Sequence, residues 1–383
     1  MNDVSSAFVK RSMSKLCVHH IGARGETQAL PAMEQFESGI INVLYEADES
    51  CIDELRRINI GRQAQVVVVP RCVAGHTGRR LFFHSQHEYG SSLLEADPGV
   101  GDLYLPAHWI DYDYTVYDAL RAKARQEVDV QTLDDIVSTA TDVPYPDFLS
   151  LDTQGSELEI LQGSPHSLQT ALCIVTEVEF LSLYKEQPLF GDVCSFLTSA
   201  GFIFAKFFTI FTGSHFRSPL GLRGEGVPIT TDALFLRDPR TVFDGPGSHD
   251  EKRLALQKLT FFSLVYGFFE HAAWASTLAA QCPSGGEAVE IPDKAWYRFV
   301  LEFSEIARTF PAMFPPSFQE RQQDGEFGKQ AFIQRAMKEQ SAIDSSMGRL
   351  CRSLRHYGLG HLAELLETRL RSCRQRLGIP ISR

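Results

Sequence analysis

The predicted fold is organised around the segment Asp147-Phe148-Leu149-Ser150-Leu151-Asp152-Thr153-Gln154-Gly155-Ser156-Glu157-Leu158-Glu159-Ile160-Leu161. Its apolar start predicts a short buried strand that stops at Asp152. Gly155 then predicts a turn, and a helix with acids in its first turn follows. In an open α/β sheet, ligands bind outside the carboxyl ends of the strands. Asp152 therefore stands where a ligand is expected.

Two roles are open for Asp152. A carboxylate at the end of a strand can orient a cofactor, accept a proton or hold the hydroxyl of an acceptor. The same carboxylate can simply cap the helix that follows the turn. The residues of this segment fit both roles.

The composition is that of a globular protein long enough for two or three domains. The chain has 383 residues, of which 44% are hydrophobic and 22% are charged. No apolar run is long enough to cross a membrane, and residues 1–15 lack the apolar core of a signal peptide, so we expect a cytoplasmic protein. The eight cysteines show neither CxxC pairs nor a Cys/His spacing. This favours reduced thiols, and we expect no metal site.

The net charge of −11 argues against nucleic acid or an acidic membrane as a partner. The charge is unevenly divided, because residues 1–245 carry a net −14 and residues 246–383 a net +3. The sequence Asp244-Gly245-Pro246-Gly247-Ser248 is typical of a linker. We therefore predict one domain over residues 1–245, able to fold by itself, and a second over residues 246–383.

Strand and helix patterns alternate through the first of these domains. This alternation predicts an α/β fold with a mainly parallel sheet. The segments 86–113 and 213–228 are rich in polar residues, Gly and Pro and are predicted to be loops. Strands are predicted at 16–21, 40–45, 65–69, 80–84, 127–132, 148–151, 171–178, 202–208 and 233–236, and helices at 27–38, 49–58, 133–137 and 193–200.

The second domain has no strand pattern. Helical periodicity over 252–280, 296–310, 329–345 and 349–374 predicts four or five packed helices.

A glycine turn and an acid indicate an adenosine-containing cofactor. The turn Ile21-Gly22-Ala23-Arg24-Gly25 follows the first strand, and its glycines let the backbone approach a ligand closely. Glu46 ends the second strand, where a carboxylate can accept both hydroxyls of a ribose. The spacing is G-x-x-G rather than G-x-G-x-x-G, and phosphate-binding bases are sparse. A ligand without phosphates, such as S-adenosylmethionine, fits this pattern better than a nicotinamide cofactor.

Several segments occur in an order that resembles the FkbM family of S-adenosylmethionine-dependent methyltransferases. The most specific is the pattern D-x-x-G-x-E-x-x-x-L-x-G, which starts at Asp152 and which Gly163 completes. The resemblance covers roughly residues 16–238, and the helical tail lies outside it. The segments are His20-Ile-Gly-Ala-Arg-Gly25, Tyr45-Glu-Ala-Asp48, Ser91-Ser-Leu93, Thr132-Leu-Asp-Asp-Ile136, the 148–161 segment and Val175-Thr-Glu177.

This resemblance implies a fold, an activity and a set of site residues. The fold is a seven-stranded class I (Rossmann-like) methyltransferase sheet with a reversed last strand, here followed by a C-terminal all-helical domain. The activity is methylation of a hydroxyl on a sugar, a polyketide or a related small molecule. Carried over by position, Gly22, Ala23, Gly25 and Glu46 bind the cofactor, and Asp152, Gln154, Glu157 and Glu177 line the methyl-transfer cleft.

Two residues depart from the family pattern. The acid that usually precedes Ile-Gly-Ala is His20 here. A neutral histidine can hydrogen-bond the ammonium of the cofactor, whereas a cationic one would repel it; the residue can also be an ordinary core histidine. Arg24 replaces the usual Asn and could pair with the cofactor carboxylate.

We therefore expect an S-adenosylmethionine-dependent methyltransferase that acts on a hydroxyl of a small molecule such as a carbohydrate. Asp152 or Glu177 is the expected base or orienting group. The alternative is a catalytically degenerate methyltransferase fold that serves as a binding or scaffold protein through its helical tail. That tail is also the candidate surface for self-association.

Overall fold

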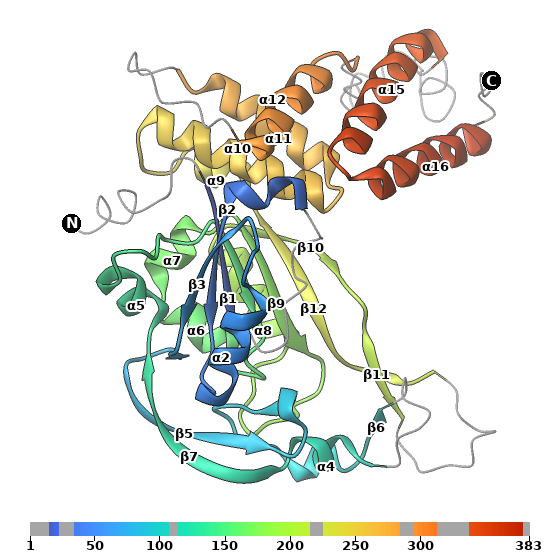
Figure 1. Ribbon diagram of the computed structural model, residues 1–383. Helices are drawn as coiled ribbons and strands as arrows, with labels where there is room; N and C mark the ends of the chain where they lie inside the picture. Colours follow the sequence, from blue (N-terminus) through green and yellow to red (C-terminus); the bar gives the residue numbers. More distant parts are fainter. Residues whose placement is uncertain are drawn as a thin grey trace.

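The computed structural model describes residues 15–22, 34–106, 114–214, 225–283, 294–311 and 337–377. Figure 1 shows three layers along its vertical direction: a helical tail at the top, a central sheet, and a smaller sheet at the bottom. The predicted turn residues Ala23, Arg24 and Gly25 lie outside the described residues.

The central sheet has nine strands among the described residues. Their order is β3-β2-β1-β8-β9-β12-β11-β6, and β10 also pairs with β12. The strands are β1 (Leu16–Ile21), β2 (Ile40–Tyr45), β3 (Gln65–Val69), β6 (Leu105–Pro106), β8 (Phe148–Leu151), β9 (Cys173–Glu179), β10 (Phe202–Phe207), β11 (Phe211–Ser214) and β12 (Val227–Arg237).

The sheet is mixed, and its strand count corrects the prediction of seven strands. Strands β1, β2, β3, β8 and β9 are parallel, whereas β12 runs antiparallel to both β9 and β10. The extra strands arise because β12 is 11 residues long and β10 pairs only with its second half. Strand β11 pairs with the first half, and β6 pairs with β11, so the exposed edge of β12 is covered.

A second, three-stranded sheet follows β3 in the chain. It contains β4 (Cys72–Val73), β5 (Gly78–Ser85) and β7 (Ala122–Gln131), in the order β4-β7-β5. Both predicted segments, 80–84 and 127–132, lie mostly within these longer strands. The predicted loop 86–113 contains η2 (Glu88–Gly90), α3 (Pro98–Gly101) and β6 among its described residues, and α4 (Val116–Leu120) follows it.

Helices cover both faces of the central sheet. One face packs against α5 (Leu133–Thr139), α6 (Glu157–Gln162), α7 (Pro165–Thr170) and α8 (Phe190–Ser199). The side chains of Val43, Leu149 and Ile174 belong to this core because alternate residues of a strand point to the same face. On the other face, α2 (Glu49–Ile58) packs through Leu55 against Leu44. The described part of the predicted helix 27–38 is the 3-10 helix η1 (Glu34–Gly39).

The tail consists of helices, and two helical segments are divided differently from the prediction. The segment 252–280 is interrupted at Gly267, whose φ of +79° is unsuited to a continuous helix. Gly358, with φ +71°, likewise separates the last two helices. The helices are α9 (Pro239–Phe243), α10 (His249–Val265), α11 (Phe269–Gln281), α12 (Ala295–Ala307), α15 (Gln340–His356) and α16 (Gly360–Leu377).

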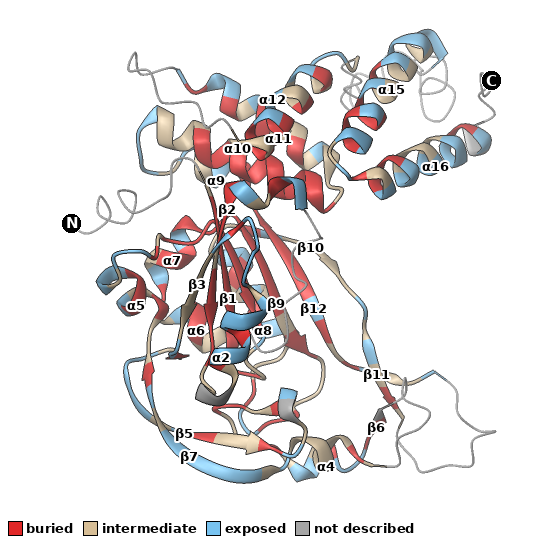
Figure 2. Cartoon of the chain, viewed as in Figure 1, coloured by how far each residue is buried: buried red, intermediate tan, exposed pale blue. Residues whose placement is uncertain are grey.

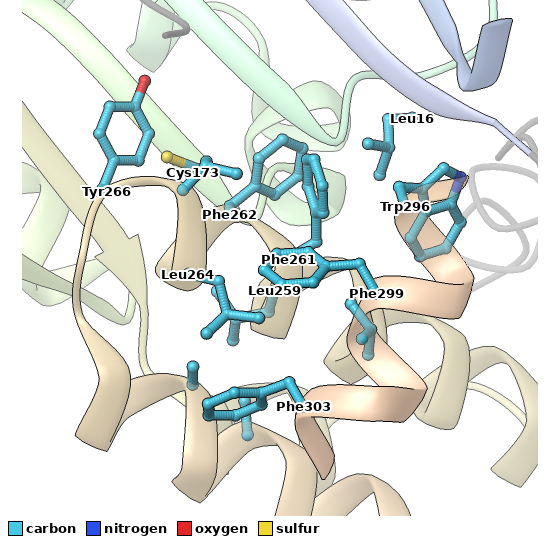
Figure 3. Packing of buried hydrophobic residues seen from close by; sticks show 14 of the residues in the cluster. Leu16, Cys173, Leu259, Phe261, Phe262, Leu264, Tyr266, Trp296, Phe299 and Phe303 are labelled. Carbon is cyan, nitrogen blue, oxygen red and sulfur yellow. The ribbon is translucent and has the colours of Figure 1, made fainter. Parts of the chain in front are cut away.

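The tail packs on the end of the central sheet where the parallel strands begin. Figure 3 shows Phe261 and Phe262 of α10 in the middle of this cluster, with Leu16 and Cys173 of the sheet on one side and Phe303 of α12 on the other. Figure 2 shows that α10 and the neighbouring strand ends are buried. The core is thus continuous across residue 245, and the division into two domains at that residue stays a prediction.

A buried ion pair joins the same two parts. Lys258 of α10 and Asp147, which precedes β8, are both fully buried, and their Nζ and Oδ2 atoms are 2.7 Å apart. Lys258 also donates to the carbonyl oxygen of Lys15, and the backbone N–H of Cys17 donates to Asp147. The start of β1 and the start of β8 are therefore fixed to the tail by charged hydrogen bonds.

All eight cysteines are free thiols, as the spacing predicts. Within the described ranges, no helix combines the length and the apolar character needed to span a membrane.

Candidate active site

A pocket lies at the carboxyl ends of β1, β2 and β8. Its cavity volume is about 80 Å³, and the wider depression, counted out into open solvent, is about 670 Å³. Four of the residues that the sequence predicts for the site line it: Gly22, Glu46, Asp152 and Gln154. His20, Glu157 and Glu177 are not among its lining residues, although the last two bond to the loop that carries Asp152.

Gly22 is required by the close approach of two strand ends. Its φ is +82°, and a Cβ atom at this position would lie 1.9 Å from the carbonyl oxygen of Asp152. The backbone N–H of Asp152 donates to the carbonyl of Ile21, and that of Gly22 donates to Tyr45. These contacts hold Asp152 directly beside the end of β1.

Glu46 follows β2 and turns its carboxylate toward the pocket. Its side chain is buried, with an exposed fraction of 7%, and its Oε1 accepts a hydrogen bond from the backbone N–H of Asp48 at 2.8 Å. A short local hydrogen bond of this kind fixes the orientation of the carboxylate before any ligand arrives.

The turn after β8 is held by Glu157. The turn places Gln154 at φ 59° and Gly155 at φ 104°, two left-handed residues in succession. The buried carboxylate of Glu157 accepts hydrogen bonds from the backbone N–H groups of Thr153 and Gly155. Burial raises the pKa of Glu157 to about 7, against the opposing effect of these hydrogen bonds. Glu157 thus lies beneath the turn and shapes it.

Gln154 connects the two acids that the sequence proposes for catalysis. Its amide Nε2 donates to Asp152 Oδ1 at 2.8 Å and to Glu177 Oε2 at 2.5 Å. The other oxygen of Glu177 accepts a hydrogen bond from Thr230 Oγ1 at 3.1 Å. Asp152 and Glu177 are therefore close neighbours although they come from different strands.

Five acids influence one another at this edge of the sheet: Asp152, Glu157, Glu177, Glu179 and Asp232. Burial raises the pKa of Glu177 well above its usual value, and the other four acids raise it further. Burial is also the main cause of the raised pKa of Asp232, to about 6. The carboxylate of Asp152 reaches solvent through the pocket, but the surrounding protein desolvates it enough to raise its pKa. This edge of the sheet is thus able to hold and release protons near neutral pH.

His20 is neutral at physiological pH. It is buried, with an exposed fraction of 6%, and burial lowers its pKa to about 4. Its Nδ1 has no hydrogen-bond partner among the described residues. The repulsion that a cationic histidine would exert on an ammonium group is therefore absent, while its role in cofactor binding stays a prediction.

Several pocket residues do not follow from the strand-end pattern. Arg71 reaches the pocket from the connection between β3 and β4, Phe82 from β5 and Tyr89 from η2. Ser91, part of the Ser-Ser-Leu segment, also lines it, and the neighbouring Ser92 contacts Gln154. In the described ranges, no group of three His, Cys, Asp or Glu side chains is placed to hold a metal ion.

The mixed sheet, with five parallel strands and the antiparallel β12 beside β9, and the pocket at the ends of the parallel strands are consistent with a Rossmann-like methyltransferase fold. Residues 17–204 match the family model described as the methyltransferase FkbM domain, so the resemblance is confirmed over these residues. Searches of curated proteins and of solved structures gave no match. Nothing in these comparisons supports the scaffold alternative.

Proposed function

We propose that the protein is an S-adenosylmethionine-dependent methyltransferase that methylates a hydroxyl of a small molecule, such as a carbohydrate or a polyketide. The observation that carries this proposal is the shared pocket of Glu46 and Asp152. It brings together a carboxylate suited to ribose hydroxyls and a carboxylate suited to a reacting hydroxyl, at the ends of β2 and β8, the two parallel strands that flank β1.

The charges of the pocket fit a cationic cofactor. Its described lining residues include the carboxylates Glu46, Asp48 and Asp152, and Arg71 is the only cation among them. Such a set attracts a sulfonium and an ammonium group, whereas a pyrophosphate would be repelled. This supports S-adenosylmethionine over a nicotinamide cofactor.

Asp152 is the better placed of the two candidate bases. Glu177 accepts hydrogen bonds at both of its oxygens, from Gln154 and from Thr230. Asp152 accepts a hydrogen bond from Gln154 and interacts with Glu177, and its side chain is open to the pocket. A base must reach the proton it removes, and Asp152 lines the pocket whereas Glu177 does not.

The residues of this chain then share the work of methyl transfer. When bound, S-adenosylmethionine supplies an activated methyl group on a positively charged sulfur. Asp152 would take the proton that the acceptor hydroxyl loses as its oxygen bonds to the methyl carbon and the bond from that carbon to sulfur breaks. The raised pKa of Asp152 suits this role, because a carboxyl with a pKa nearer neutrality is a stronger base. Gln154 holds the carboxylate in place throughout.

Calorimetric titration with S-adenosylmethionine tests the proposal. We expect binding to the full chain and, in Glu46→Ala, an affinity weakened by about 1.5–3 kcal/mol, the range of hydrogen bonds to charged groups. Glu54→Ala is the matched control, since Glu54 is an exposed acid of α2. Absence of binding to the wild type would overturn the proposed function, and unchanged affinity in Glu46→Ala would remove its ribose role.

The predictions on the acceptor, the location and self-association are considered last. A small-molecule acceptor is favoured over nucleic acid or an acidic membrane because the net charge of the chain is −11. Cytoplasmic location and self-association through the tail stay predictions.

A further inference from the structure

Hydrogen bonds hold Gln154 at three points, two on its side-chain amide and one on its backbone carbonyl. Its Nε2 faces the two acids, its backbone carbonyl accepts a hydrogen bond from Ser92 Oγ at 2.7 Å, and its side-chain Oε1 lies 3.2 Å from the hydroxyl of Tyr184. Ser92 and Tyr184 are both buried, with exposed fractions of 0% and 1%. Neither of them is among the residues that line the pocket.

These hydrogen bonds counteract two unfavourable features of Gln154. Its backbone has φ 59°, which costs a non-glycine residue about 1–3 kcal/mol. Its amide can also rotate by half a turn, which would point the carbonyl oxygen at two acids. The hydroxyl of Tyr184 shares its one proton between the carbonyl oxygen of Gly90, at 3.0 Å, and Oε1 of Gln154, at 3.2 Å, and this arrangement leaves the NH₂ side of the amide for the acids.

We propose that Tyr184 and Ser92 are positioning residues of the methyl-transfer site, which hold Gln154 so that its amide donates to Asp152 and Glu177 together. The inference rests on the proposed function and deepens it. With both protons of the amide committed, Asp152 and Glu177 each keep one oxygen turned away from Gln154. That of Glu177 is bonded to Thr230, whereas Asp152 lines the pocket, so of the two acids Asp152 is the one that faces a ligand.

The orientation of the Gln154 amide affects the pH at which Asp152 and Glu177 titrate. An amide that donates to a carboxylate favours its charged form, whereas an amide that offers its oxygen favours the protonated form. Five acidic groups face this region, namely Asp152, Glu157, Glu177, Glu179 and Asp232, and Tyr184 faces them from the adjoining segment. Loss of the Tyr184 hydroxyl should therefore move the titration of the Asp152–Glu177 pair to higher pH.

The decisive variant is Tyr184→Phe, which keeps the buried ring and removes the hydroxyl. The pair is followed by NMR on the full chain labelled with ¹³C at Asp and Glu carboxyls, and its signals are identified with Asp152→Asn and Glu177→Gln. We expect the midpoint to rise by about one pH unit, the effect of one hydrogen bond to a charged group. Tyr117→Phe is the matched control, since Tyr117 packs against the same small cluster and its hydroxyl makes no hydrogen bond to the described residues.

A second variant covers the case in which Tyr184→Phe does not fold. Ser92→Ala removes the hydrogen bond to the Gln154 backbone, and we expect a shift in the same direction. An unchanged midpoint in a folded Tyr184→Phe, or in Ser92→Ala if only that variant folds, would overturn the inference. A loss of folding alone does not move the midpoint of a folded population, so it cannot imitate the expected result.

The titration needs neither cofactor nor acceptor, so it separates this inference from the proposed function. We also expect S-adenosylmethionine to bind Tyr184→Phe within about threefold of wild type, because Tyr184 does not line the pocket. Absence of S-adenosylmethionine binding to the wild type would overturn the proposed function, and Tyr184 and Ser92 would then have no role in methyl transfer. A shift of the titration would still show that Tyr184 orients Gln154.

Discussion

Two acids of similar chemistry occupy different environments at the end of the sheet. Glu177 is half-buried, hydrogen-bonded at both oxygens and surrounded by four other acids. Asp152 is open to the pocket, accepts a hydrogen bond from Gln154 and interacts with Glu177. Different surroundings can give two carboxylates different roles, and we propose proton acceptance for Asp152 and electrostatic support for Glu177.

The substitution Asp152→Asn tests this assignment. Asparagine keeps the shape of the side chain but removes its charge and basicity. We expect normal folding, cofactor affinity within about tenfold of wild type, and methyl transfer reduced by roughly 10²-fold or more, the usual contribution of a positioned base. The measurement is single-turnover transfer from labelled S-adenosylmethionine to an identified acceptor.

The matched control for that experiment is Asp53→Asn, because the side chain of Asp53 is 95% exposed on α2. Near-wild-type transfer in Asp152→Asn would return Asp152 to a helix-capping role and move the base role to Glu177.

The sequence predicts some of these site residues and misses others for a physical reason. Glu46 and Asp152 could be placed because parallel strands end at the same edge of a sheet, so an acid after each strand reaches the same pocket. The Ser91-Ser-Leu93 segment was recognised by its resemblance, but the contacts of Ser92 and Tyr184 with Gln154 could not be predicted, because they depend on the left-handed backbone of Gln154. Left-handed backbone is uncommon at residues other than glycine, and no residue pattern signals it here.

At the scale of elements, continuous apolar runs make the strands predictable. The bounds of β1, β2, β3 and β8 agree with the segments predicted from the sequence. The predicted loop 213–228 and the predicted strand 233–236 leave the first half of β12 unrecognised, because Pro228 and Asp232, which are uncommon in strands, interrupt its pattern. The break between α10 and α11 was missed because apolar residues continue on both sides of Gly267.

Gly22, at the end of β1, lets the backbone of Asp152 lie close to that strand end. In Gly22→Ala, the new methyl group would meet the backbone of Asp152, and the backbone would keep a φ of +82° that alanine disfavours. We expect the free energy of unfolding to fall by at least about 2 kcal/mol, together with weaker cofactor binding. Urea denaturation measures the first effect and calorimetry the second.

Gly191→Ala provides the control for Gly22→Ala. Gly191 lies in α8, and a Cβ atom there would have no neighbour within 4 Å. We expect its stability to stay within about 1 kcal/mol of wild type, or to increase, because alanine favours a helix more than glycine does. Equal stabilities of the two variants would mean that the close approach of β1 and β8 does not matter.

At the scale of the whole molecule, the tail and the methyltransferase sheet share one core. Side chains from β1, β8, β9 and β12 belong to the same cluster as those of α10, α11 and α12. The net charges of residues 1–245 and 246–383 are opposite in sign, and this contrast suggested a boundary. Composition does not reveal that the two parts bury their apolar surfaces against each other, so the packing could not be predicted from it.

Removal of the buried ion pair between Lys258 and Asp147 tests how strongly the tail is joined to the central sheet. Lys258→Met would leave Asp147 buried without its cation, and we expect a loss of about 3–5 kcal/mol in the free energy of unfolding. The double variant Lys258→Met with Asp147→Asn should recover part of this loss, because the amide oxygen can still accept from Cys17. Chemical denaturation of both variants provides the values.

Lys185→Met is the comparison for that pair. Lys185 is half-exposed and pairs with Glu95 at the surface, so its removal should cost less than about 1 kcal/mol. A similar small loss in Lys258→Met would show that the tail is only loosely attached, in agreement with two independent domains.

The central claim is that one pocket holds an adenosine cofactor between Glu46 and Asp152. A crystal structure of the full chain with S-adenosylhomocysteine tests it most directly. We predict that the ribose hydroxyls contact the carboxylate of Glu46 and that the sulfur lies on the side of the pocket that Asp152 and Gln154 form. S-adenosylhomocysteine bound elsewhere, or bound here with its ribose away from Glu46, would contradict the account.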